Sequence, residues 1–201
     1  MSQPAEFSPE TDDLNAWKVV SVQLQSARRP MVSTKFGPES AVLLHMVTNL
    51  LPDIPVVWVD TGYNTRATLL FAEHLTEQMS LNLSVWKPKS SHVYRVPPAI
   101  DEPDHTQFTE EVKLEPFRRA LAVHRPDIWF SGLRREQTSH RSNLEMLEEH
   151  AKGYRKVYPL LDWSASDVER YLEYHHLASE TDYYDPTKGI AHRECGLHLM
   201  Y

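Results

Sequence analysis

The stretch that decides the fold is Met31-Val32-Ser33-Thr34-Lys35-Phe36-Gly37-Pro38. Its first half is short and apolar at the start, which predicts a β-strand over residues 31–34. Its second half contains glycine and proline and predicts a turn. Pro38 then suits the first position of a helix, because its fixed φ is already helical, and the helix is expected from Glu39 to about Leu51. The stretch therefore predicts a strand, a turn and a helix in immediate succession.

The same alternation continues along the chain. Further strands are expected over residues 56–59, 81–86, 128–132 and 155–161. Helices are expected over residues 9–27, 65–80, 115–124, 141–150, and from Ser164 or Ser166 to about His176. Residues 87–110 contain four prolines and predict a long loop. This order predicts an α/β fold with a mainly parallel sheet, helices on both faces and right-handed crossovers.

The length of the chain and its pattern of apolar residues predict one domain and a tail. The chain has 201 residues, which suits a single globular domain. We expect an α/β domain over residues 1–177, of which residues 1–30 form an N-terminal helical segment. Residues 178–201 show no regular pattern and are expected to form a C-terminal tail.

The composition excludes several classes of protein. The formal net charge of -7 disfavours nucleic-acid binding, which needs a basic face. No apolar run reaches the roughly 18 residues that span a membrane, and the acidic N-terminus lacks the order of a signal peptide. The chain has one cysteine, so an intrachain disulfide is impossible, and a cytoplasmic protein is expected. His175 and His176 are adjacent and point apart on a helix, and no HExxH or Cys/His array is present, so no metal site is expected.

Polar loops follow three of the predicted strands, over residues Ser33–Ser40, Asp60–Tyr63 and Gly132–Gln137. The carboxyl ends of parallel strands share one edge of the sheet, and ligands of such folds bind beyond that edge. We therefore expect the three loops to converge on one site.

The first loop has the chemistry of an anion site. Backbone N–H groups at the start of a helix, the hydroxyls of Ser33, Thr34 and Ser40, and the charge of Lys35 can all hold an anion. The loop is not a Walker A motif, because the GxxxxGK[ST] pattern is absent. The alternative is a plain strand–turn–helix connection with hydroxyls that only cap the helix.

The other two loops carry an acid and an arginine pair. Asp60, before Thr61 and Gly62, can accept hydrogen bonds from a ribose or a base, or it can simply cap the following helix. Arg134 and Arg135 suit phosphate or sulfate, which a guanidinium binds through two hydrogen bonds. The alternative for the pair is a solvated surface.

The single cysteine, Cys195, lies close to the end of the chain. Lys188, His192, Arg193 and His198 surround it in sequence and favour the thiolate, which is the nucleophilic form. The alternative is a small buried apolar side chain. We expect a nucleophile that the tail carries to a site built by the rest of the chain. Since no second cysteine exists, redox chemistry at Cys195 requires an outside thiol or dithiol.

Six pieces of the sequence resemble the sulfonucleotide reductases, specifically the cluster-free branch of the phosphoadenylyl-sulfate (PAPS) reductase family. They are Ser33-Thr34-Lys35-Phe36-Gly37, Pro52–Pro55 with Asp60-Thr61-Gly62-Tyr63, Lys113-Leu114-Glu115-Pro116, Gly132-Leu133-Arg134-Arg135-Glu136-Gln137, Pro159–Trp163, and Glu194-Cys195-Gly196-Leu197-His198. The resemblance implies the adenine-nucleotide-hydrolase-like fold, which is PP-loop or Rossmann-like, often as a homodimer. The iron–sulfur branch has paired cysteines where this chain has Phe108 and Thr109, so no iron–sulfur cluster is expected.

The resemblance also implies a reaction. Cys195 would attack the sulfur of PAPS and form an S-sulfocysteine, and thioredoxin or glutaredoxin would then release sulfite. The substrate-binding residues implied are Ser33, Thr34, Lys35, Phe36, Gly37, Ser40, Asp60, Thr61, Gly62, Arg134, Arg135, Gln137, Arg193 and His198, with Lys113 as a weaker candidate. No bound cofactor is implied.

This chain differs from the family pattern at two places. Lys35 stands where the family commonly has a small hydroxyl residue, and the segment before the cysteine is short, spanning only Thr181–Gly189. Either Thr187 and Lys188 replace the missing contacts, or the substrate is another nucleotide, such as adenylyl sulfate (APS). Two further alternatives stay open: a related ATP pyrophosphatase, adenylyltransferase or sulfur transferase with Cys195 as sulfur carrier, and a nucleotide-sensing module without catalysis.

Overall fold

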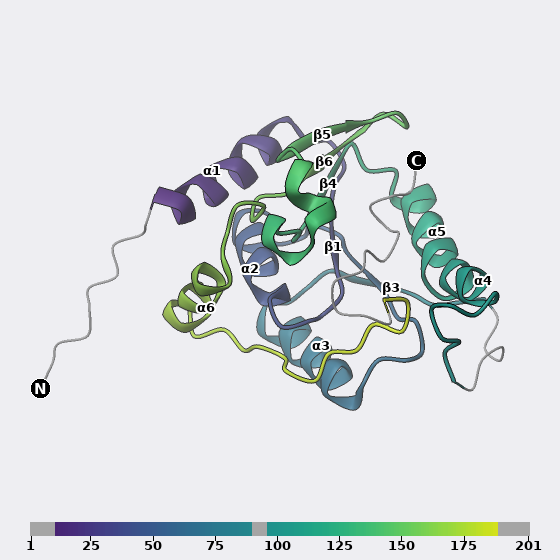
Figure 1. Cartoon of the computed structure of the whole chain (residues 1–201). Coiled ribbons are helices and arrows are strands. Elements are labelled where there is room, and N and C mark those ends of the chain that lie inside the picture. The colour runs from purple at the N-terminus through teal and green to yellow at the C-terminus, as the bar shows by residue number, and fades with distance from the viewer. Residues whose placement is uncertain (1–10, 90–95, 189–201) are drawn as a thin grey trace, which may run out of the picture.

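The computed structural model describes residues 11–89 and 96–188 of the chain (Figure 1). The strands are β1 Pro30–Thr34, β2 Val56–Val59, β3 Leu83–Trp86, β4 Ile128–Ser131, β5 Leu147–His150 and β6 Tyr154–Val157. The α-helices are α1 Thr11–Ser26, α2 Ser40–Leu50, α3 Arg66–Gln78, α4 His105–Thr109, α5 Glu115–His124 and α6 Ala165–Tyr174. Shorter helical turns are the π-helix η1 Glu110–Leu114 and the 3-10 helices η2 Arg135–Gln137 and η3 Ser139–Asn143.

The strands form one six-stranded sheet in the order β3-β2-β1-β4-β6-β5. Every neighbouring pair is parallel except β5 and β6, which are antiparallel. The prediction of a mainly parallel sheet is therefore confirmed. The strand β1 pairs with both β2 and β4, so the strand order reverses at β1. In open α/β sheets this reversal point is where a ligand-binding crevice opens.

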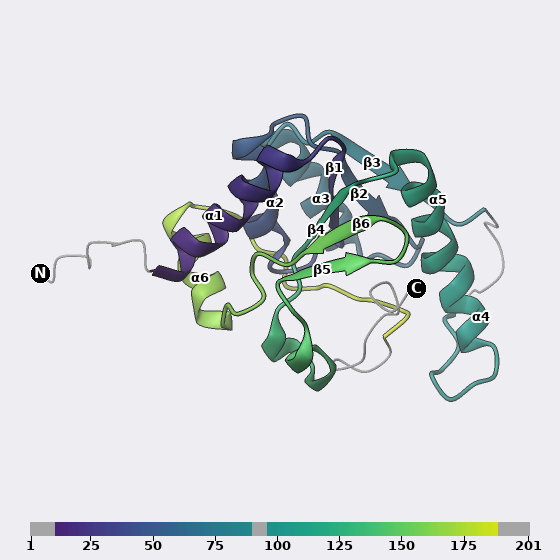
Figure 2. The same cartoon turned by 90° about the horizontal axis from the view of Figure 1, so that it is seen from above.

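Alternating side chains of the central strands bury both faces of the sheet. Val32, Val56 and Phe130 face a core that includes α1, α2, α3 and α6. Met31 and Trp129, on the opposite face, pack against α5. Figure 2 shows α5 separated from α1 and α6 by the sheet. Helices on both faces are thus confirmed, although four cover one face and α5 is the main cover of the other.

The expected helix over residues 141–150 is wrong. Residues 139–143 form η3, and Leu147–His150 form the edge strand β5. The reason is tertiary pairing: a tight turn at Gly153, whose φ is +83°, folds β5 back onto β6. Glu149 then accepts from Arg155 at 2.6 Å across the hairpin. The helix propensity of the glutamates and leucines here is a weak preference, and the hairpin contacts override it.

Other boundaries differ by a few residues. The strand expected over 155–161 is β6, Tyr154–Val157, because the chain turns at Tyr158, where Leu161 N–H donates to the Tyr158 carbonyl at 3.1 Å. The last part of the long loop over 87–110 is helical, as α4. Ser164 and Ser166 were the two predicted caps of α6. The cap is Ser164, whose hydroxyl accepts from Asp167 N–H at 3.2 Å.

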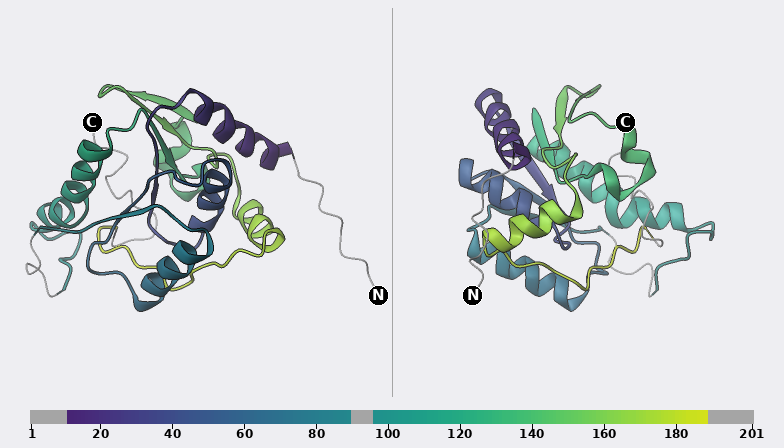
Figure 3. Two further views of the ribbon diagram at one scale, coloured as in Figure 1. Left: turned by 180° about the vertical axis from the view of Figure 1, so that it is seen from behind. Right: turned by 60° about the vertical axis from the view of Figure 1, so that its left-hand side comes forward.

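The chain after α6 crosses the carboxyl edge of the sheet beside α3 (Figure 3). Ser179 Oγ donates to the Pro38 carbonyl at 2.9 Å, and Thr65 Oγ1 donates to the Asp182 carbonyl at 2.9 Å. Thr68 also donates to the buried carboxylate of Glu180 at 3.0 Å. These bonds bring residues 179–188 over the loops that follow β1 and β2. Within the described residues, no helix is long and apolar enough to cross a membrane.

Candidate functional site

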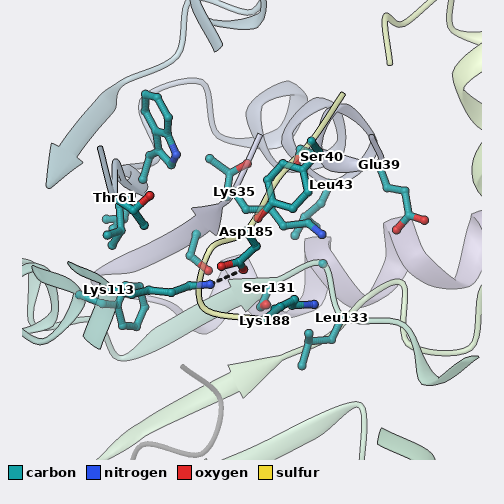
Figure 4. A pocket seen from close by; sticks show the side chains of 18 of the residues that line it. Lys35, Glu39, Ser40, Leu43, Thr61, Lys113, Ser131, Leu133, Asp185 and Lys188 are labelled. Carbon is teal, nitrogen blue, oxygen red and sulfur yellow. Dashed lines mark hydrogen bonds and ion pairs between the residues drawn. The ribbon is translucent and has the colours of Figure 1, made fainter. Parts of the chain in front are cut away.

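A pocket opens at the carboxyl ends of β1 and β4, at the reversal point of the sheet. Ser33 and Thr34 end β1 and line one wall, and Ser131, which ends β4, lines another together with Gly132, which follows it. Residues Tyr183–Pro186 and Lys188 complete the lining, and Figure 4 shows Asp185 and Lys188 among the side chains of the pocket. The empty volume is about 1070 Å³, including the opening to solvent.

The loop after β1 has an unusual backbone conformation. Ser33 Oγ accepts from Trp129 Nε1 at 2.8 Å, and Thr34 Oγ1 accepts from Phe36 N–H at 3.1 Å. Phe36 has a φ of +51°, which costs a bulky residue on the order of 1–3 kcal/mol. The Phe36 ring compensates by complete burial, with its edge against Trp58 at a centroid distance of 5.0 Å. Phe36 therefore holds the loop against the hydrophobic core and does not line the pocket.

Lys35 projects from this loop into the pocket. Its ammonium lies over the ring of Tyr183, 4.6 Å from the centroid. Gly37 leaves room for it, because a Cβ there would lie 2.9 Å from Lys35 Cε. The Lys35 side chain is accessible to solvent through the pocket, but the protein around it removes much of the water that would solvate its charge. This desolvation, followed by the charge of Lys188, lowers the pKa of Lys35 to about 8.

A buried ion pair fixes the segment above the pocket. Lys113 Nζ lies 2.5 Å from Asp185 Oδ2, and the two side chains are 8% and 5% exposed (Figure 4). Lys113 also donates to Thr187 Oγ1 at 3.2 Å. Burial alone would raise the pKa of Asp185, but the charge of Lys113 and the hydrogen bonds of Lys113 and Thr187 lower it to about 2. Lys113, from the π-helix η1, is therefore the anchor of this segment.

Arg134 does not reach the pocket as an open anion-binding group. Its side chain is 4% exposed and pairs with Glu39 and Glu136, and it donates to the Trp163 carbonyl at 3.2 Å. Desolvation opposes its charge, but the hydrogen bonds and charge of Glu39 outweigh this and raise the pKa of Arg134. Arg134 thus fastens η2 to the start of α2.

Arg135 is turned toward the far side of η2. Its Nε donates to Asp162 at 2.8 Å, and its Nη1 donates to the carbonyls of Ser142 and Leu144 at 2.9 and 2.6 Å. The role of both arginines in binding the ligand stays a prediction, and in this structure neither of them lines the pocket. The physical reason is that each guanidinium is held by carboxylate and carbonyl oxygens of the protein itself.

Gln137 and Ser40 do line the pocket, together with Glu39 and Arg141. Gln137 Nε2 donates to Glu39 Oε2 at 2.7 Å, and its Oε1 accepts from Arg141. Sequence reasoning missed Glu39 and Arg141. Their signal was adjacency to the first and third loops, but either residue type is also common on a solvated surface.

The loop after β2 is only partly in the pocket. Thr61 lines it, and so does Asn64, which the sequence did not single out. Asp60 lies outside the lining, where it accepts from Gly62 N–H at 3.0 Å and from Asn64 Nδ2 at 2.7 Å. Gly62 has a φ of +84°, which the tight turn requires. Asp60 therefore shapes this loop but does not cap the following helix, because the cap of α3 is Thr65, whose hydroxyl accepts from Thr68 N–H at 3.1 Å.

Three predicted site residues, Arg193, Cys195 and His198, lie outside the described residues. Of the remaining set, the pocket brings together Ser33, Thr34, Lys35, Ser40, Thr61 and Gln137. It adds the weaker candidate Lys113 and residues of the segment 183–188, of which Tyr183, Tyr184 and Asp185 were not predicted. Their contribution comes from the path of the chain over the sheet edge, which local sequence does not reveal.

A family model described as the phosphoadenosine phosphosulfate reductase domain matches residues 29–183. Proteins named phosphoadenosine 5′-phosphosulfate reductase are also similar. The one from Synechocystis is 33% identical over 220 residues, covering 94% of this chain and 88% of the relative. The one from Synechococcus is 39% identical over 153 residues, covering 73% of this chain and 66% of the relative. The Synechocystis alignment is longer than this chain, so that relative contains residues with no counterpart here.

Solved structures show the same fold. The PAPS reductase of Candida auris, in a phosphate complex, has a TM-score of 0.71 at 19% identity, covering 89% of this chain and 92% of that one. The FMN adenylyltransferase of Candida glabrata, in complex with FMN and an ATP analogue, has a TM-score of 0.61 at 15% identity, covering 87% of this chain and 60% of that one. These likenesses confirm the predicted PP-loop-like fold. Together with the family match over residues 29–183, they lead to one conclusion: the chain belongs to the phosphoadenosine phosphosulfate reductase family.

Proposed function

We propose that the protein reduces 3′-phosphoadenylyl sulfate to sulfite and adenosine 3′,5′-bisphosphate, with Cys195 as nucleophile and an external dithiol protein as electron donor. Membership of the family supports the class of reaction. The substrate, the S-sulfocysteine on Cys195 and the donor, thioredoxin or glutaredoxin, are the parts that we propose.

The observation that carries the proposal is the position of Lys188. Lys188 lines the pocket, and Cys195 follows it by seven residues. An extended chain covers roughly 3.3–3.6 Å per residue, so the seven residues after Lys188 can span up to about 25 Å. The shortened segment before the cysteine is therefore long enough to deliver the thiol.

The reaction would proceed in two steps. The Cys195 thiolate forms a bond to the sulfate sulfur while the bond from that sulfur to the phosphate oxygen breaks, which releases adenosine 3′,5′-bisphosphate. One thiolate of the donor then attacks Cys195 Sγ and releases sulfite, with the electron pair of the sulfur–sulfur bond. The second donor thiol resolves the mixed disulfide and regenerates Cys195. Sulfur is reduced by two electrons, and the donor leaves as a disulfide. An outside dithiol is needed because the chain has a single cysteine.

The charges in the pocket support an anionic substrate despite the negative net charge. Lys35 and Lys188 line the pocket, and neither has a carboxylate within ion-pair distance among residues 11–89 and 96–188. Ser33, Thr34 and Ser40 add hydroxyls beside them. Such donors suit phosphate and sulfate oxygens.

The test is intact-protein mass spectrometry after incubation with PAPS and no reductant. We expect an adduct of about 80 Da on Cys195, absent in Cys195→Ser and removed by reduced thioredoxin. APS in place of PAPS, as a parallel sample, decides whether the 3′-phosphate is required. Failure of both nucleotides to form the adduct would refute the mechanism. Release of pyrophosphate from ATP would favour an ATP-using enzyme instead.

A further inference from the structure

The cations in and beside the pocket are of two kinds. Lys113, which lines the pocket, and Arg134, which lies behind it, are paired with Asp185 and Glu39 and serve the architecture. Arg141, which also lines the pocket, donates to Gln137. Lys35 and Lys188 have no such partner among the described residues. The question is therefore what the second pair holds.

Lys188 is aimed by a tight turn over residues 185–188. Lys188 N–H donates to the Asp185 carbonyl at 3.1 Å, which closes a β-turn with Pro186 at its second position. Asp at the first position and Pro at the second both favour this turn. Asp185 Oδ1 also accepts from Thr187 N–H at 3.0 Å and from Thr187 Oγ1 at 2.7 Å. The turn is thus fixed internally before any ligand binds.

The turn is also fixed to the body of the protein. Lys113 joins both Asp185 and Thr187, and the Thr187 residue is only 2% exposed. Lys188 directly follows this anchored threonine, and it lines the same pocket as Lys35, which comes from the loop after β1. Two lysines that are far apart in sequence are therefore brought to one cavity by a buried ion pair.

We propose that Lys35 and Lys188 together form a seat for one phosphate group of the nucleotide, which we call the dilysine seat. The inference rests on the proposed function, because it names how that site holds its substrate. Two ammonium groups in one cavity repel each other, and the charge of Lys188 is among the causes that lower the pKa of Lys35. A dianion between them would remove this repulsion and satisfy both groups.

The seat gives the turn a function. It joins the loop after β1 to the turn that lies seven residues before Cys195. The same anion would therefore hold the base of the tail in place while the thiol reacts. Lys188 is in this sense a binding and positioning residue, and Lys113 and Asp185 position it.

Calorimetric binding without turnover tests the seat. The probes are adenosine, adenosine 5′-monophosphate, adenosine 3′-monophosphate and adenosine 3′,5′-bisphosphate. The variants are Lys35→Met, Lys188→Met and the double variant, with Lys18→Met, an exposed lysine on α1, as the matched control. We expect each single variant to weaken the bisphosphate by about tenfold or more, a loss typical of a charge-assisted hydrogen bond. Lys18→Met should match the wild type.

The monophosphates identify which group occupies the seat. If the variants lose affinity only for the 5′-monophosphate and the bisphosphate, the seat binds the 5′-phosphate, at the reacting end of the substrate. If they lose affinity only for the 3′-monophosphate and the bisphosphate, the seat binds the 3′-phosphate. If both lysines hold one group, the loss in the double variant is smaller than the product of the single losses. Unchanged bisphosphate affinity, or an equal loss for adenosine, would overturn the seat.

The outcome is separable from that of the proposed function. If bisphosphate binding is weakened in both lysine variants and the wild type forms no Cys195 adduct, the dilysine seat is supported and the proposed reduction is refuted. An adduct that forms at the wild-type rate in both variants at subsaturating PAPS supports the reduction and refutes the seat.

Discussion

Asp185→Asn is the substitution that most directly tests how the segment over the pocket is held. The pKa of the Asp185 carboxyl is lowered from 3.8 to about 2, mainly because Lys113 and Thr187 outweigh the effect of burial. At 1.36 kcal/mol per pKa unit, this difference corresponds to about 2 kcal/mol at neutral pH. Removing one partner of a buried ion pair can cost more, about 3–5 kcal/mol, because Lys113 is left buried without its counter-charge.

The loss should appear as local opening of residues 182–188, since this segment is attached to the body of the protein by few bonds. Hydrogen exchange at the Thr187 and Lys188 amides is the assay, because both donate to Asp185. A loss of about 2 kcal/mol lowers their protection by about 30-fold. The asparagine Oδ1 can still accept from Thr187, so the change isolates the charge.

Asp182→Asn is the matched control, because Asp182 lies on the same segment and is exposed. We expect it to exchange like the wild type. Adding Lys113→Met to Asp185→Asn removes the unpaired charge and should restore part of the protection. In the wild type, protection should be lost as the pH falls through about 4 toward 2, because a carboxyl with a lowered pKa stabilises only while it is ionised. Protection in Asp185→Asn within about threefold of the wild type would refute the reasoning.

Three further outcomes follow from the loops around the pocket. Gly37→Ala should weaken nucleotide binding by about tenfold with an unchanged circular dichroism spectrum, because the new Cβ displaces Lys35 Cε, 2.9 Å away. Affinity for adenosine 3′,5′-bisphosphate should fall between about pH 7 and 9, since the pKa of Lys35 is lowered to about 8, and a flat profile in calorimetry would contradict this. Arg134→Met should lose about 3 kcal/mol in urea unfolding, because Glu39 and Glu136 both lose their cationic partner, whereas Arg135→Met, at a more exposed position, should lose under about 1 kcal/mol.

The central strands show what local pattern can predict. Val32 and Phe130 face one layer of helices, and Met31 and Trp129 face the other, so both strands are apolar on both sides. That pattern is typical of a buried parallel strand and needs no tertiary information. By contrast, Leu147–His150 has good helix formers and still forms a strand, because β6 offers it an edge to pair with. Pairing between segments is not encoded in either segment alone.

The site shows the same division more sharply. The sequence predicted an anion-binding loop at Ser33, Thr34 and Lys35, and all three line the pocket. It also predicted Arg134 and Arg135 from their charge. Their partners, which include Glu39, 95 residues before Arg134 in sequence, could not be read from the arginines themselves. A charge in the sequence shows what a residue can bind, but its neighbours in space decide whether that capacity is already used.

The sequence by itself determined the α/β alternation of the central parallel strands and their helices, and the carboxyl-edge location of the polar loops. It also determined that redox chemistry at Cys195 would require an outside thiol, because the chain has one cysteine. These depend on local periodicity, turn residues and counting. The tertiary structure alone decided which cations are neutralised and which line the pocket unpaired by carboxylates of the described residues. It decided this because Lys113 meets Asp185, 72 residues later, and only that buried ion pair brings Lys188 to the same cavity as Lys35.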